Sequence, residues 1–285
     1  MSGPRALAAV LLAVVIMVPA EADPAGGQVV LLQSAACPAP AALTRIEPEL
    51  GRVAAMLAAH RPITIVAVGS SSTEGVGASA PALNYPSQLE RDLRARLPGA
   101  ELRVLNRGRG GEDAGEELAR LERDVLAVHP DLVIWQVGTN AVLRRDDLAA
   151  DAELLERGVA RIKASGADLV LMDLQYAPRV LARPAYALME QVLADAAERD
   201  HVPLFRRFAM MRYWQNEPSS AVPITVGPDG LHMNDAGYGC LAAALADALV
   251  ANWHSEVKAA TRNPAAPSGS LAARPPSASA ADRLR

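Results

Sequence analysis

Short apolar runs alternate with longer amphipathic stretches along most of this chain. The apolar runs, rich in β-branched residues and leucine, predict five buried strands, at residues 63–68, 102–105, 132–137, 169–174 and 202–205. Apolar residues at helical spacing predict helices at residues 85–97, 114–128, 148–164, 186–199 and 236–253. Strands that alternate with helices predict an α/β fold, in which helices cover both faces of a parallel sheet.

The first 22 residues have the pattern of a secretory signal peptide. Arg5 precedes an apolar run over residues 6–18, and Pro19-Ala20-Glu21-Ala22 gives it an A-x-A ending. The run is shorter than the about 20 apolar residues that a membrane span needs. We therefore predict a mature chain that starts near Asp23, has no stable membrane span and is periplasmic or secreted. Retention of the segment as an N-terminal anchor is the alternative.

Composition divides the rest of the chain into three parts. Residues 23–42 are predicted to be an N-terminal extension, and residues 43–255 a single domain with a sizeable core. Residues 256–285 consist mainly of Ala, Pro and Ser, so we predict a disordered tail. The formal net charge of −4 gives no basic footprint, and nucleic acid is not an expected partner.

The chain has two cysteines, Cys37 and Cys240, and neither belongs to a CxxC pair. This arrangement does not favour a zinc site. Two cysteines of an exported protein can pair, so we predict a disulfide between them. Two separately buried thiols are the alternative.

Four polar motifs lie where chemistry is expected in such a fold. The first three each follow a predicted strand, and the fourth precedes the last helix. They are Gly69-Ser70-Ser71-Ser72-Thr73, Asn106-Arg107-Gly108-Arg109-Gly110-Gly111, Gly138-Thr139-Asn140 and Asp229-Gly230-Leu231-His232. Active sites of parallel sheets lie beyond the carboxyl ends of the strands. Together the motifs supply a serine hydroxyl, backbone N–H groups, an Asn amide and an Asp–His pair, which are the groups that acyl transfer uses.

Each motif alone also has a plain structural interpretation. The serines can cap a helix, Asn140 can cap the next element, and Asp229 can be a turn residue. The glycine-rich motif can be an ordinary strand–helix turn: it fails the dinucleotide fingerprint because Asp113 stands where the third glycine belongs. A phosphate loop is excluded because Gly-Lys-Ser/Thr is missing.

The Asp–His pair is the most informative of the four motifs. Among the five histidines, only His232 follows a carboxylate by three residues within a loop rich in proline and glycine. At this spacing Asp229 can accept a hydrogen bond from one imidazole nitrogen and leave the other free to act as a base.

The ordered motifs resemble those of the SGNH (GDSL-type) hydrolase family over roughly residues 63–253. The resemblance implies a flavodoxin-like three-layer α/β/α sandwich with a parallel five-stranded sheet, and esterase or lipase activity that often removes acetyl groups from carbohydrates. It assigns Ser71 as the nucleophile, His232 as the base and Asp229 as the partner of the base. It assigns the oxyanion hole to the N–H groups of Ser71 and Gly111 and the side-chain amide of Asn140.

The chain departs from the usual motifs at two positions. Ser70 stands where the GDSL motif has Asp, so Ser70 and Ser72 remain alternatives to Ser71 as the nucleophile. Ala141 stands where the family more commonly has Asp after the Asn, which affects the loop and leaves the amide of Asn140 in place.

We therefore expect an exported serine esterase, independent of metals and cofactors, that hydrolyses short-chain esters of small molecules or carbohydrates, acetyl esters above all. A non-catalytic exported carbohydrate-binding module on the same fold and an O-acyltransferase are the alternatives. Trp135, Tyr176 and Trp214 are candidates either for a sugar site or for the core.

Overall fold

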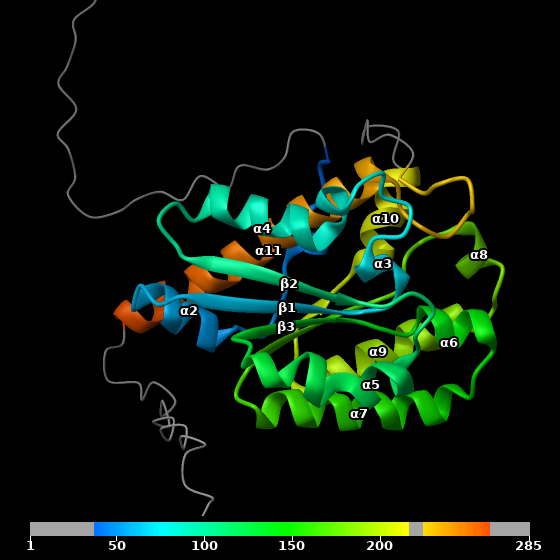
Figure 1. Cartoon of the computed structure of the whole chain (residues 1–285), viewed down its shortest axis with the longest axis horizontal. Coiled ribbons are helices and arrows are strands. Elements are labelled where there is room, and N and C mark those ends of the chain that lie inside the picture. The colour runs from blue at the N-terminus through cyan, green and yellow to red at the C-terminus, as the bar shows by residue number, and fades with distance from the viewer. Residues whose placement is uncertain (1–36, 217–224, 263–285) are drawn as a thin grey trace, which may run out of the picture. The chain divides into compact units, whose positions relative to one another are not determined.

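A parallel five-stranded sheet forms the centre of the computed structural model, which describes residues 37–216 and 225–262 (Figure 1). The strands are β1 (Ile63–Gly69), β2 (Leu102–Gly108), β3 (Leu132–Gln136), β4 (Asp168–Met172) and β5 (Leu204–Phe205). Their order across the sheet is β2-β1-β3-β4-β5, and every pair is parallel. The predicted signal peptide and the chain beyond residue 262 lie outside the described residues.

Helices cover both faces of this sheet (Figure 1). One layer holds α2 (Gly51–Ala58), α4 (Tyr85–Arg96), α10 (Arg207–Asn216) and α11 (Asp235–Arg262), and the other holds α5 (Ala114–Asp124), α6 (Thr139–Arg144), α7 (Leu148–Ala164) and α9 (Tyr186–Asp200). Ile65 and Ala67 of β1 face the first layer, and Val66 and Val68 face the second. This alternation gives each layer its own apolar core. The predicted α/β/α sandwich is confirmed.

Short elements connect the sheet and the two layers. They are α1 (Ala41–Thr44), α3 (Ser71–Glu74), α8 (Pro178–Leu181) and the 3-10 turns Pro81–Leu83 and Leu126–Val128. The last of these turns completes the helix predicted at residues 114–128, which breaks at Val125. Helices α2, α6 and α10 and the short helices α1, α3 and α8 were not predicted.

Two elements are longer than predicted. Strand β2 runs three residues further, to Gly108, because Asn106, Arg107 and Gly108 continue the pairing with β1. As an edge strand, β2 can carry polar residues there. Helix α11 continues beyond Trp253 to Arg262. Residues 254–263 contain no glycine or proline that would interrupt the helix. The helix ends just before Pro264, because the residue that precedes a proline is disfavoured in a helix.

A disulfide and hydrogen bonds attach residues 37–50 to α11. A disulfide joins Cys37 to Cys240 in the second turn of that helix, with 5.4 Å between their Cα atoms. Further along, the side chain of Asn252 accepts a hydrogen bond from the Leu50 N–H (2.9 Å) and donates to the carbonyl oxygens of Ile46 and Pro48. The segment that precedes β1 thus depends on the last helix of the domain.

Loss of the disulfide is expected to lower the free energy of unfolding by about 5 kcal/mol, because the bond closes a loop of 203 residues and restricts the unfolded chain. Urea unfolding of the oxidised wild type, the reduced wild type and Cys240→Ser measures this. Reductant should leave Cys240→Ser unchanged. An unfolding midpoint of the wild type that does not respond to reductant would contradict the prediction.

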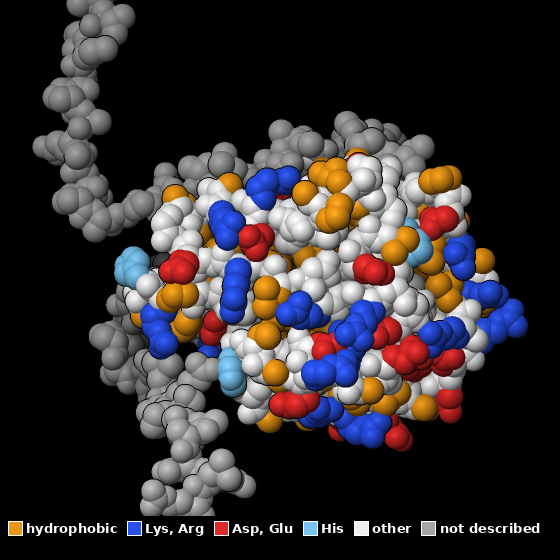
Figure 2. All heavy atoms as spheres, viewed as in Figure 1, with side chains coloured by type: hydrophobic (Ala, Val, Ile, Leu, Met, Phe, Trp, Pro, Cys, Tyr) orange, Lys and Arg blue, Asp and Glu red, His pale blue; other side chains and the backbone are white. Residues whose placement is uncertain are grey.

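Charged side chains of both signs lie next to one another on the face that Figure 2 shows. Arg123 pairs with Asp124 (2.7 Å) on α5, and Arg144 of α6 pairs with Glu116 (3.1 Å). Such mixed charges keep the local potential low. Within residues 37–216 and 225–262, no helix combines the length and the apolar character of a membrane span.

Candidate active site

Ser71 is the first residue of α3 and lies two residues beyond the end of β1. The turn that carries it is fixed to the neighbouring strand by Gln136 at the end of β3. Oε1 of this buried side chain accepts hydrogen bonds from the Ser70 N–H (3.2 Å), the Ser70 hydroxyl (3.3 Å) and the Thr73 hydroxyl (3.2 Å). Gln136 was not predicted from the sequence, because one polar residue at a strand end gives no signal of its own.

The three consecutive serines differ in their surroundings. Ser70 and Ser72 are buried, whereas Ser71 is only half-buried. The Ser71 Oγ lies 2.8 Å from Nε2 of His232. Among the three hydroxyls that the sequence left open as nucleophiles, the structure therefore places that of Ser71 against the imidazole.

His232 and Asp229 lie in the loop before α11. The imidazole Nδ1 is 2.5 Å from the Asp229 Oδ2, while the Asp229 Oδ1 accepts hydrogen bonds from the N–H groups of Leu231 and His232, both at 3.0 Å. The carboxylate thus acts as a turn residue and as a partner of the imidazole, two roles that the sequence presented as alternatives. With Nδ1–H donated to Asp229, Nε2 is left to accept the Ser71 proton.

The pKa of Asp229 lies below its usual value. Partial burial raises this pKa, but the N–H groups of Leu231 and His232 and the His232 ring together lower it by more. Asp229 is therefore an anion at neutral pH. An anion beside Nδ1 stabilises the imidazolium that forms when Nε2 takes a proton.

The glycine-rich turn after β2 passes directly beside α3. At Gly108 an added Cβ would lie 2.0 Å from the Glu74 nitrogen, so only glycine allows this approach. Gly110 also lies beside α3, with its Cβ position 3.9 Å from the Ser71 Cβ. Gly111 has a φ of +82°, a conformation that favours glycine. In the described chain, no group accepts a hydrogen bond from the N–H of Ser71 or of Gly111. Both N–H groups are available to an oxygen of a substrate.

Asn140 lies in the first turn of α6 and contacts the same glycine-rich turn. Its Nδ2 donates a hydrogen bond to the Glu112 carbonyl oxygen (2.8 Å), which leaves the second N–H of the amide for another acceptor. The residue that caps α6 is Gly138, without a side-chain cap, so Asn140 does not have the capping role that was its alternative.

The aromatic candidates for a sugar site belong largely to the core. Trp135 is buried and donates its Nε1–H to Glu117 (2.7 Å), and Trp214 is buried and donates to the Pro38 carbonyl oxygen (3.1 Å). Tyr176 is half-buried and packs edge-on against Phe208, with ring centroids 5.2 Å apart. Over the described ranges, no group of three or more His, Cys, Asp or Glu side chains is arranged to hold a metal ion.

Comparison with known proteins places this chain among ester hydrolases. The model of a family described as "Non-GDSL lipase-like family" matches residues 36–255. An arylesterase of Vibrio mimicus is 27% identical over 172 residues, which are 58% of this chain and 82% of that protein.

Solved structures of similar fold include two esterases of different size. The lipase/acylhydrolase from Enterococcus faecalis has a TM-score of 0.55 and 27% identity, and the match covers 65% of this chain and 93% of that one. A two-domain esterase active on acetylated mannans has a TM-score of 0.58 and 24% identity, with coverage of 76% and 56%. The match therefore spans about half of the two-domain protein.

Proposed function

Because the chain belongs to the non-GDSL lipase-like family and is a carboxylic ester hydrolase, we propose that Ser71, His232 and Asp229 form its catalytic triad. The observation that carries this proposal is the unbroken line of contacts from the Ser71 hydroxyl through His232 to Asp229. The family's description agrees with Ser70 standing where the GDSL motif has Asp. The chain thus resembles the SGNH hydrolases as a broad group but does not have the Asp of the GDSL motif.

In the proposed reaction, Ser71 Oγ attacks the ester carbonyl carbon while Nε2 of His232 takes the hydroxyl proton. The imidazolium then gives this proton to the leaving alcohol as the C–O bond breaks, and an acyl-enzyme remains. Water attacks the acyl-enzyme in the second half, with His232 again as the base, and the acid leaves. Asp229 holds the imidazole with Nε2 facing the serine throughout.

The developing oxyanion is proposed to lie among three donors: the N–H groups of Ser71 and Gly111 and the free N–H of Asn140. Two observations support this: the Cβ position of Gly110 lies 3.9 Å from the Ser71 Cβ, and Asn140 donates a hydrogen bond to Glu112. The three segments therefore lie close together. Each such donor contributes about 3 kcal/mol to the stabilisation of the transition state.

The substrate is proposed to be a short-chain ester, above all an acetyl ester, of a small molecule or a carbohydrate. In the part of the chain that the structure describes, the exposed large hydrophobic side chains are Val76 (40% exposed) and Leu188 (58%), which do not amount to an apolar trough. We further propose that the protein is exported to the periplasm or the medium; its disulfide supports this, because such bonds persist in oxidising compartments.

The acyl preference gives the experiment that tests this function. With p-nitrophenyl esters of two to eight carbons, kcat/KM is expected to fall as the chain lengthens, because the added methylenes find no apolar surface to bury. If a trough existed, each buried methylene would add about 0.8 kcal/mol of binding, and a rise of roughly tenfold or more would identify a lipid site.

The same assay separates the alternatives. An acceptor alcohol that diverts most acyl groups from water would identify an O-acyltransferase. A folded protein that turns over none of the esters would support the binding module.

A further inference from the structure

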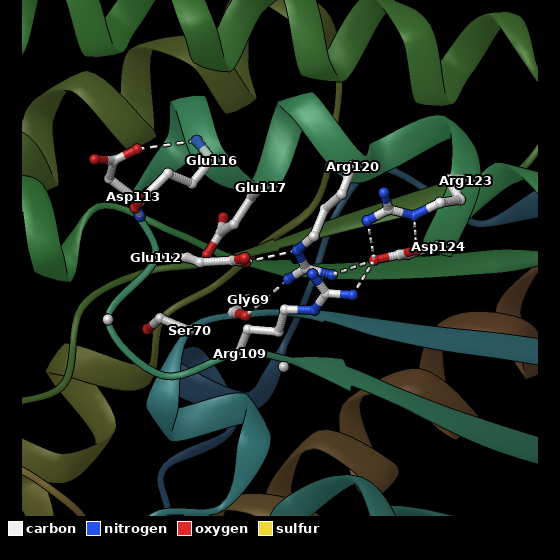
Figure 3. A network of polar contacts seen from close by, with 12 residues as sticks. Gly69, Ser70, Arg109, Glu112, Asp113, Glu116, Glu117, Arg120, Arg123 and Asp124 are labelled. Carbon is white, nitrogen blue, oxygen red and sulfur yellow. Dashed lines mark hydrogen bonds and ion pairs between the residues drawn. The ribbon is translucent and has the colours of Figure 1, made fainter.

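Arg120 of α5 is an arginine held almost wholly inside the domain, with a side chain only 4% exposed. Its two hydrogen-bond partners, Gly69 and Glu112, lie at the edge of the sheet that carries the candidate site (Figure 3). Its Nε donates a hydrogen bond to Glu112 Oε2 (2.6 Å), and its Nη2 donates to the Gly69 carbonyl oxygen (3.3 Å). Gly69 lies two residues before Ser71, and Glu112 directly follows Gly111.

Glu112 extends these contacts to the third donor. Its backbone carbonyl oxygen accepts the hydrogen bond from Asn140 Nδ2. One guanidinium is thus connected to the segments of all three proposed oxyanion donors: to that of Ser71 through Gly69, and to those of Gly111 and Asn140 through Glu112.

Gly110 and Gly111 lie between two residues of the turn that are ion-paired with α5. On their N-terminal side, Arg109 pairs with Asp124 of α5 (2.7 Å), and on their C-terminal side Glu112 pairs with Arg120 of the same helix (Figure 3). Gly111 has no side chain that packing could hold, and the space around its Cβ position is empty to 4 Å. Its carbonyl oxygen accepts a hydrogen bond from Arg144 of α6. The direction of its N–H is therefore set by this bond and by the residues on either side.

A contribution to the stability of the fold does not explain why an arginine is buried at position 120. Its Nη1 is buried without a hydrogen-bond partner, and the Asp124 Oδ2 lies 3.6 Å from it. An ion pair that is buried with an unmatched donor is often no more stable than an apolar side chain of similar volume.

We propose that Arg120 is a positioning residue, which holds the oxyanion donors of the Ser71, Gly111 and Asn140 segments in one geometry. This inference rests on the proposed function. Because the donors that Arg120 positions act on the oxyanion, Arg120 should contribute to stabilisation of the transition state and not to binding of the ester.

Arg120→Met tests the proposal. We expect kcat for p-nitrophenyl acetate to fall about 10²-fold, the cost of losing one well-placed oxyanion donor, while KM changes little. Arg120→Lys, which keeps the charge and one donor, should recover part of the loss.

Arg96→Met is the matched control. Arg96 of α4 is partly buried, with a side chain 12% exposed. Its Nε donates to Asp247 of α11 at the same 2.6 Å, and it also donates to backbone carbonyl oxygens. It lies in the other helix layer and should keep kcat. Equal losses of kcat in the two variants would reduce Arg120 to a structural role and overturn the proposal.

A second readout reports on the oxyanion itself. A trifluoromethyl ketone forms a tetrahedral adduct with the serine, whose oxyanion needs the same donors as the transition state. Its inhibition constant should rise in Arg120→Met in parallel with the fall in kcat/KM, and should not change in Arg96→Met. An unchanged inhibition constant in Arg120→Met would also overturn the proposal.

If Arg120→Met does not fold, Glu112→Gln tests the same proposal. The amide oxygen can still accept from Arg120 without the charge, so a smaller loss in kcat is expected, again with little change in KM. Esterase activity that depends on Ser71 but is undiminished in the folded Arg120 and Glu112 variants overturns the positioning role alone. A wild type without activity that depends on Ser71 overturns the proposed function and the positioning role together.

Discussion

Ser71→Ala is expected to lower kcat for p-nitrophenyl acetate by roughly 10⁵-fold, the largest effect of any single change that we foresee. The variant removes the hydroxyl 2.8 Å from Nε2 of His232 and leaves the oxyanion donors in place. Steady-state hydrolysis, together with stoichiometric labelling by a phosphonofluoridate probe and mapping of the labelled serine, measures it.

Ser70→Ala and Ser72→Ala are the controls for this experiment. Both side chains are buried, and Ser70 donates to Gln136, so these changes should affect stability more than turnover. A folded Ser71→Ala protein within roughly tenfold of the wild-type rate would show that another group is the nucleophile.

Asp229→Asn is expected to lower kcat by roughly 10³–10⁴-fold with little loss of stability. The Asn Oδ1 can keep both hydrogen bonds from the Leu231 and His232 N–H groups, so the turn is preserved. The amide nitrogen that replaces Oδ2 would donate to Nδ1, and this reverses the tautomer: Nε2 then carries the proton and cannot accept another. Hydrolysis rates and thermal unfolding of the same samples separate the two effects.

Asp235→Asn is a suitable control, because this carboxylate also accepts a backbone N–H and a side-chain donor, both from Ser79 (2.8 and 2.6 Å). It begins α11 and contacts neither Ser71 nor His232. Comparable losses of kcat in the two variants would argue against a specific role of the imidazole partner.

The sheet was predictable from the sequence because its inner strands, β1, β3 and β4, are buried on both faces. Such strands appear as continuous apolar runs, and the alternation with amphipathic helices defines a parallel sheet. Helix α7 was predicted to the residue, since Gly166 lies just beyond its end. The residues around Ser71 were recognisable because three motifs follow strands, whose carboxyl ends meet at one edge of a parallel sheet.

Other features depend on contacts between distant residues and had no signal in the sequence. Helix α10 has apolar residues at helical spacing, but it begins at the fully buried Arg207, a residue type that usually marks a surface. Gln136 and Arg120 act on backbone groups of other elements, at Ser70 and Gly69. Only the folded chain brings these groups within hydrogen-bond distance.

The separation of Ser71 from His232 along the chain has a consequence for synthesis. The two residues that touch are 161 positions apart, and the cysteines that pair are 203 apart. At about 5–20 residues per second, a ribosome releases the serine roughly ten to thirty seconds before the histidine. A nascent chain, or one cut short before Asp229, has the serine without the imidazole. With the proposed triad, hydrolysis of an ester by this protein therefore reports that synthesis has passed His232.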